Sequence, residues 1–240
     1  MAIGTPQRGC RLNQALAFTA RVHDKQKIEG LWLAQQPFVH AVRSGWATPE
    51  DLARWVRQVY CTTATYGEVL RSMCPPPPVG LWTDPWRDME QLIELAGALG
   101  VGPAEMERLA TSPATRAVQV WLRQNLTDPS RHIPAQVCWA LVEAMSPETG
   151  THLDGGAAKH LGVKAKHLGY FRIGMRSRRS ADRYAANLLT RISMKDWCVV
   201  QEKTLLLSRL MIQVYDSIGA RCPSPFNRTI WQSRVTQSAQ

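Results

Sequence analysis

Apolar residues in this chain recur every three to four positions over most of its length, and they almost never alternate with a period of two. A spacing of three and four residues places side chains on one face of an α-helix, whereas alternation marks a half-buried strand. The run Leu52, Trp55, Val56 and Val59 follows the helical spacing. Because such stripes are buried by packing helix against helix, we expect a single all-α domain over residues 1–240 with negligible strand.

Capping residues and prolines divide this pattern into separate helices. Thr48 followed by Pro49 and two acids is a typical start, because threonine caps free N–H groups and acids suit the positive end of the helix dipole. We expect helices over 31–45, from Thr48 to the prolines Pro75–Pro78, over 84–100, briefly from Pro103, from Ser112 through Leu122, from Pro134 to near Pro147, over 163–190 and over 193–218. We also expect a loop at 148–156, an N-terminal extension at 1–29 and a polar tail at 219–240.

Composition excludes several classes of protein. The chain is 45% apolar and 20% charged, as globular proteins are, and it has no apolar run long enough to span a membrane. The segment MAIGTPQRGCRLNQ has no apolar region, so we do not expect it to act as a signal peptide. The six scattered cysteines form no CxxC pair, and we therefore expect reduced thiols and a cytoplasmic protein. The net charge of +10 comes without a DNA-binding motif, so we expect no nucleic-acid partner.

The basic residues of the 163–190 helix divide between two faces. One face carries a solvated stripe made of Arg172, Arg176, Arg179 and Arg183. Arg178 lies on the opposite face, which should look into the bundle, and the small residues Gly174 and Ala181 leave space around it. Arg178 is therefore a candidate for binding a carboxylate or another anion. The alternatives are that it reaches the surface or pairs with a core acid.

Glu143 is the second candidate, because it lies in the apolar helical segment CWALVEAM. An unpaired carboxylate would be costly to bury there, so Glu143 needs a cation, a metal or a proton. The alternative is a glutamate on the helix surface.

From Pro37 onward the chain resembles the haem-oxygenase-like superfamily, which holds the TenA thiaminases, the PqqC proteins and the diiron oxidases. The matching segments are PFVHAVRSGWATPEDLARWVRQVY, MEQLIELAGALGVGPAEMERL followed by SPAT, GYF at 169–171 and QEKT at 201–204. The resemblance implies a bundle of about seven to eight helices around a closed pocket, usually in a homodimer.

The resemblance also implies where a diiron centre would lie and shows that most of its ligands are replaced. Glu143 matches the middle-helix glutamate of the diiron members, and Asp88 stands where they have a histidine. Their H-x3-D-x2-H positions read Gly174, Arg178 and Ala181 here, and the segment of the early acid is shortened to 75–83. TenA proteins have Asp where Val59 stands, and PqqC proteins have Arg in place of Gly174. A standard diiron centre is therefore not expected, because iron needs several His and carboxylate ligands.

We therefore expect an enzyme of biosynthetic metabolism that acts, without a metal cofactor, on a small amino-acid-derived or aromatic carboxylate. Arg178 would bind the substrate anion, Glu143 would pair with Arg178 and move a proton, and Tyr170 and Asp88 would support them. Further candidates for the pocket are His40, Tyr60, Tyr66, Glu68, His167 and Gly174. Two alternatives stay open: an iron-dependent oxidase with unusual ligands from Glu143, Asp88, Glu68 and a histidine, and a non-catalytic protein that binds a small molecule or a partner.

Overall fold

A computed structural model describes residues 5–73, 84–108, 111–174 and 178–219 of the chain. These residues form α-helices and short 3₁₀ turns with no strand, which confirms the all-α bundle. The helices are α1 (Thr5–Ile28), α2 (Pro37–Ser44), α3 (Pro49–Ser72), α4 (Pro85–Ala98), α5 (Pro103–Arg108), α6 (Pro113–Leu126), α7 (His132–Glu143), α8 (Ser146–His160), α9 (Gly169–Gly174), α10 (Arg178–Leu189) and α11 (Trp197–Gly219). The 3₁₀ turns are Leu33–Gln35, Ala165–His167 and Met194–Asp196. None of the described helices is both long and apolar enough to cross a bilayer.

The predicted helix starts at three prolines are confirmed by their caps. The Thr48 hydroxyl accepts a hydrogen bond from the backbone N–H of Asp51, whose carboxylate in turn accepts from the Thr48 backbone. Asp84 and Ser112 cap α4 and α6 through their side chains in the same way. Because each cap satisfies N–H groups that lack a partner within the helix, local sequence is sufficient to fix these three starts.

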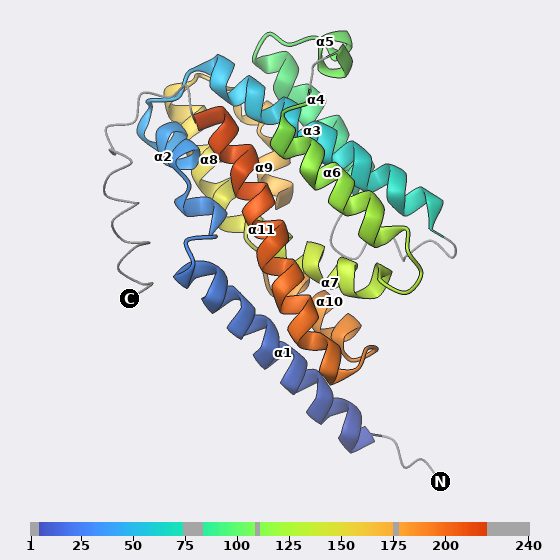
Figure 1. Cartoon of the computed structure of the whole chain (residues 1–240). Coiled ribbons are helices and arrows are strands. Elements are labelled where there is room, and N and C mark those ends of the chain that lie inside the picture. The colour runs from blue at the N-terminus through green and yellow to red at the C-terminus, as the bar shows by residue number, and fades with distance from the viewer. Residues whose placement is uncertain (1–4, 74–83, 109–110, 175–177, 220–240) are drawn as a thin grey trace, which may run out of the picture.

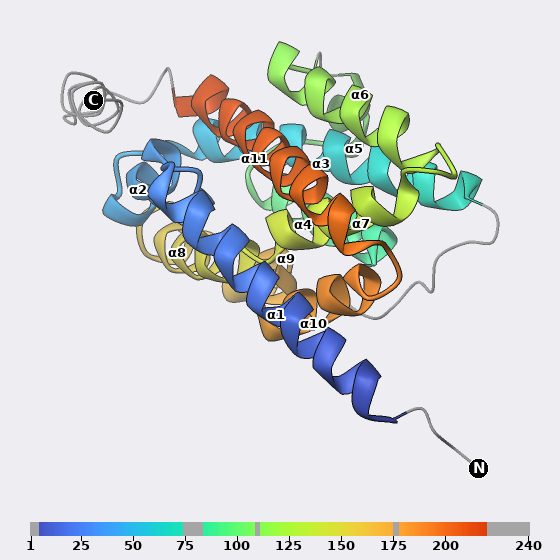
Figure 2. The ribbon, with the colours of Figure 1, turned by 60° about the horizontal axis from the view of Figure 1, so that its bottom comes forward.

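Helix α11 lies at the centre of the packing. It runs between α1 and α6 in Figure 1 and contacts α2, α3, α6 and α7 as well as α1. Helix α10 packs on α7 and α1, α3 packs on α4 and α6, and α8 packs on α2 and α9. Figure 2 shows α1 lying across α10 and α11, with its N-terminal end projecting beyond the bundle. The core is therefore shared by helices from both ends of the chain.

Two helices were not predicted from the sequence, α1 and most of α8. Within the expected N-terminal extension, α1 buries Ala15, Phe18 and Val22 at helical spacing. The expected loop at 148–156 was wrong, because these residues lie inside α8. Glycine disfavours an isolated helix, but Gly156 lies so close to the Val42 carbonyl of α2 that a Cβ atom would clash with it. The packing of α8 on α2 therefore outweighs the propensity of its glycines.

Two expected helices begin later than predicted. The one predicted over 31–45 is a 3₁₀ turn followed by α2, because Pro37 cannot continue a helix and instead occupies its first turn. The one predicted over 163–190 was wrong at its start, since residues 163–168 contain only a 3₁₀ turn and α9 begins at Gly169. Its residues 175–177 lie outside the described ranges, as do the prolines 75–78 and the tail 220–240.

Candidate functional site

A cavity of about 30 Å³ lies inside the bundle. Its walls come from α3, α7, α8, α9, α11 and the first 3₁₀ turn. It is lined by Leu33, Trp55, Val59, Thr62, Thr63, Trp139, Val142, Glu143, Ser146, Tyr170, Met211, Val214 and Tyr215. A buried water needs roughly 10–15 Å³ of such space, so the cavity holds about two or three atoms of that size.

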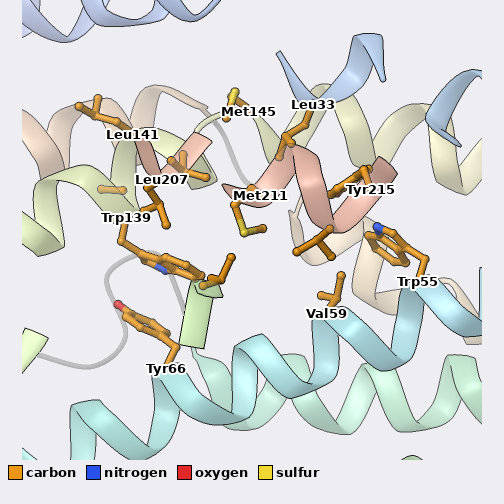
Figure 3. Packing of buried hydrophobic residues seen from close by; sticks show 14 of the residues in the cluster. Leu33, Trp55, Val59, Tyr66, Trp139, Leu141, Met145, Leu207, Met211 and Tyr215 are labelled. Carbon is orange, nitrogen blue, oxygen red and sulfur yellow. The ribbon is translucent and has the colours of Figure 1, made fainter. Parts of the chain in front are cut away.

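Aromatic rings form much of the wall. The Trp55 ring lies 6.1 Å from that of Tyr170 and 6.0 Å from that of Tyr215, centroid to centroid. Trp139 stacks on Tyr66 at 4.8 Å. Figure 3 shows Trp55, Val59 and Tyr66 along α3, with Met211 and Tyr215 of α11 opposite them. Because these rings contact one another as well as the cavity, its shape is fixed by packing.

Glu143 is the carboxyl group of the cavity, and its ionisation is disfavoured. Burial and, to a smaller extent, the nearby charge of Asp88 raise its pKa from 4.5 to about 7, although a hydrogen bond from Ser146 at 3.2 Å acts in the opposite direction. Glu143 is also the last residue of α7, and the negative end of the helix dipole there disfavours the ionised form of its side chain. At neutral pH both the acid and the carboxylate are therefore populated.

Two tyrosine hydroxyls share this environment. Burial raises the pKa of Tyr170 well above its ordinary value, and the charges of Glu143 and Asp88 raise it further. Burial likewise raises the pKa of Tyr215, with a further contribution from Glu143. Both phenols therefore stay protonated at neutral pH and can donate hydrogen bonds. We call Glu143, Asp88, Tyr170 and Tyr215 the carboxyl cluster.

The structure thus brings together three residues that the sequence singled out, Glu143, Tyr170 and Asp88. Tyr215, Thr62, Thr63 and Ser146 were missed. Tyr215 lies four residues after Met211 in α11, where a helical stripe does not distinguish a cavity tyrosine from a core tyrosine. Ser146 was missed because the helix it begins was expected to be a loop.

The expected ion pair between Glu143 and Arg178 was wrong. The Arg178 guanidinium lies 3.6 Å from Asp182, one turn along α10, and 5.3 Å from the centre of the Trp32 ring. Its side chain is 40% exposed, and it does not line the cavity. The prediction did not consider Asp182, an acid one turn further along the same helix, which supplies the partner that was sought in Glu143.

The remaining candidates do not line the cavity either. Glu68 is exposed and pairs with Arg123 at 3.1 Å. Burial lowers the pKa of His40 on α2, and the charges of Arg43 and His152 lower it further. Tyr66 does not line the cavity but stacks on Trp139, which does. Three others are placed outside the wall: Tyr60 against the core on α3, His167 in the second 3₁₀ turn and Gly174 at the end of α9.

The donor atoms near Glu143 do not fit an iron centre. Among the described residues, no group of three or more His, Cys, Asp or Glu side chains is placed to hold a metal ion. Glu143 and Asp88 supply two carboxyl groups, and Glu68, a further expected ligand, lies at the surface. Iron sites use more donors than these, including imidazoles.

No model of a known protein family matches the chain, and no curated protein matches it in sequence. A solved structure does match: heme oxygenase-1 from the cyanobacterium Synechocystis sp. PCC6803, in complex with heme. The match covers 93% of this chain and 99% of that chain, with a TM-score of 0.68 and 10% sequence identity.

The haem of that structure does not fit the cavity described above. A volume of about 30 Å³ is far too small for a macrocycle, and none of the described lining residues is a histidine, the proximal ligand of haem iron in globins and peroxidases. At 10% identity the similarity carries no chemistry from one protein to the other. It establishes the architecture: this chain has the haem-oxygenase-like fold.

Proposed function

We propose that this protein is a small-molecule enzyme of biosynthetic metabolism in which Glu143 serves as general acid and base. The observation that carries the proposal is the place of Glu143 in the wall of an internal cavity, with a pKa raised to about 7. A general acid or base works best when its pKa lies near the working pH. Strongly shifted carboxyl groups in cavities are typical of catalytic sites.

The neighbours of Glu143 define what it can do. As a carboxylate stabilised by the Ser146 hydroxyl it can accept a proton from a group bound in the cavity, and in its neutral form it can return that proton. The protonated Tyr170 and Tyr215 hydroxyls orient the bound group by hydrogen bonds. Because the walls are aromatic and aliphatic, water does not compete strongly with these contacts.

The cavity also limits the substrate. Its volume of about 30 Å³ accepts a reacting group of about two or three non-hydrogen atoms. Arg178 is not available to hold a carboxylate there, because it pairs with Asp182 outside the cavity wall. We therefore assign no step to Arg178.

The test is a turnover screen that does not require a known substrate. Purified full-length protein is incubated with a mixture of cell metabolites, and consumption and formation are followed by mass spectrometry. We expect metabolites that change with wild-type protein and change at least roughly 100-fold more slowly with Glu143→Gln, which keeps the shape of the side chain but cannot transfer a proton. Glu202→Gln, at an exposed position of α11, is the matched control and should behave as wild type. Metabolites that change equally with Glu143→Gln would contradict the proposal.

A further inference from the structure

We propose that the group bound in this cavity is a small organic amine in its cationic form. This inference rests on the proposed function, because it assigns a substrate class to the same site. It replaces the anionic substrate expected from the sequence.

The charges around the cavity favour a cation. Glu143 lines it, and Asp88 lies within electrostatic range of both Glu143 and Tyr170. Among the described lining residues there is no lysine, arginine or histidine. A carboxylate or phosphate would therefore meet negative charge without a compensating cation, whereas an ammonium group would meet an acid able to ionise.

The aromatic walls point to the same class of ligand. The faces of tryptophan and tyrosine rings carry partial negative charge and attract organic cations. Trp55, Trp139, Tyr170 and Tyr215 line a cavity that contains one carboxyl group, Glu143. Aromatic rings beside a carboxylate are well suited to a cation that has both N–H groups and C–H surface.

Hydrogen bonding favours a donor such as an ammonium group. The Thr62 hydroxyl donates a hydrogen bond to the backbone carbonyl of Gln58 at 3.1 Å. The Thr62 oxygen therefore remains able to accept a hydrogen bond from a bound group. Glu143 accepts from Ser146 and has further acceptor capacity when ionised. A metal cation is a poorer fit, because hard metal ions require more oxygen ligands than this wall provides.

The size of the cavity narrows the class. About 30 Å³ accommodates two or three non-hydrogen atoms, which corresponds to methylammonium or ethylammonium, or to the aminomethyl end of a longer molecule. Ethylammonium is therefore the appropriate probe.

Binding of the amine is coupled to the ionisation of Glu143. The groups that face Glu143 from the neighbouring helices are Asp88 of α4, Ser146 of α8, Tyr170 of α9 and Tyr215 of α11. Ammonium requires the carboxylate, so protons compete with it below a pH of about 7. Between about pH 8 and about pH 6 the ionised fraction of Glu143 falls about tenfold, and the apparent affinity should fall by the same factor.

The experiment is calorimetric titration of the full-length protein with ethylammonium chloride at about pH 8 and about pH 6. Potassium chloride, ethanol and sodium acetate serve as matched probes for charge, size and anion binding. We expect ethylammonium to bind at the higher pH, to bind about tenfold more weakly at the lower pH, and to lose at least about tenfold in affinity in Glu143→Gln. Glu202→Gln should bind as wild type.

Three results would overturn the amine assignment: no heat with ethylammonium, equal binding of ethanol or acetate, or unchanged binding in Glu143→Gln. Potassium binding as tightly as ethylammonium would also overturn it, because the site would then select charge alone. These failures are separable from failure of the proposed function. If turnover of a neutral metabolite depends on Glu143 while ethylammonium does not bind, the enzyme proposal stands and the substrate class is wrong.

Discussion

The carboxyl cluster differs from another polar cluster in the described part of the bundle in how its members are paired. The carboxyl cluster at the cavity sets two acids near each other, so that Asp88 raises the pKa of Glu143. A second cluster joins α1 to α10 and α11. It consists of His23, Gln26, Arg178, Asp182 and Ser208, and we call it the α1 cluster.

In the α1 cluster every contact joins complementary groups. One ring nitrogen of His23 lies 2.8 Å from Gln26 and the other 2.6 Å from Asp182. Gln26 donates to Ser208 at 2.9 Å. The α1 cluster is thus a satisfied network that holds three helices together, whereas the carboxyl cluster borders a cavity and opposes its own ionisation. The difference separates a structural polar network from a site that is able to act on a ligand.

The largest expected effect follows from breaking the α1 cluster at its centre. His23 is completely buried, and its removal in His23→Ala leaves Asp182 and Gln26 without their main partner. We expect the free energy of unfolding to fall by about 3–5 kcal/mol, measured by urea denaturation. His160→Ala, at an exposed position of α8, should change it by less than about 0.5 kcal/mol. If His23→Ala keeps wild-type stability, the α1 cluster is not a structural network.

The raised pKa of Glu143 in the carboxyl cluster should make the free energy of unfolding depend on pH. The pKa of Glu143 is about 7 in the folded protein and 4.5 ordinarily, so between these values the folded state binds a proton that the unfolded state releases. Stability conferred by this proton is therefore present below about pH 4.5 and is lost as the pH rises through about 7. At about 1.4 kcal/mol per pKa unit the loss of unfolding free energy is at most about 3.5 kcal/mol.

Glu143→Gln isolates this contribution. The difference in unfolding free energy between wild type and Glu143→Gln, measured by urea denaturation from about pH 4.5 to about pH 8, should change in favour of the variant as the pH rises. Other titrating groups are common to both proteins and cancel. A constant difference across this range would mean that the Glu143 carboxyl is solvated and that the contrast between the two clusters is not real.

Helix α8 contacts Glu143 of the carboxyl cluster and Trp32, which lies beside Arg178 of the α1 cluster. A displacement of α8 should therefore affect both clusters. Ser146 donates to Glu143, and Glu148 accepts from the Trp32 indole at 2.6 Å. Gly156→Ala forces α8 away from the Val42 carbonyl and should cost about 1–3 kcal/mol of stability.

The neighbouring glycine is the matched control for this displacement. Gly155 has open space around its Cβ position, so Gly155→Ala should stabilise by up to about 1 kcal/mol through helix propensity. Both variants are measured by urea denaturation. Equal effects of the two variants would show that the approach of α8 to α2 is not tight.

The parts of the fold that were predictable from the sequence are those fixed by local chemistry. Three helix starts were predictable because a side chain caps the N–H groups that follow it. These capping residues are Thr48, Asp84 and Ser112. Helix α8 was not predictable in this way, because its glycines favour a loop until packing against α2 is taken into account. Helix α1 does carry a stripe of Ala15, Phe18 and Val22, but a short stripe among polar residues is a weak signal.

The members of the candidate site that were predicted from the family resemblance lie near the cavity, whereas Arg178, predicted from its position on a helix face, does not. Glu143 and Asp88 were each assigned to a ligand position of the family pattern, and the structure brings them within electrostatic range of each other. Arg178 was placed by counting 100° steps along the predicted helix, and this count gives a direction but does not identify a partner. Asp182, one turn further along α10, is the acid that Arg178 meets.

The smallest expected effect concerns Arg178, the peripheral member of the α1 cluster. Its side chain is 40% exposed, and its partner Asp182 keeps the closer contact to His23 when Arg178 is removed. An exposed ion pair contributes little, because water and salt screen it, so Arg178→Ala should cost less than about 1 kcal/mol of unfolding free energy. Ethylammonium affinity should equal that of wild type, since Arg178 does not line the cavity. Urea denaturation and calorimetric titration of the same preparation measure both quantities, and a large loss of amine binding in Arg178→Ala would mean that the two clusters are coupled rather than separate.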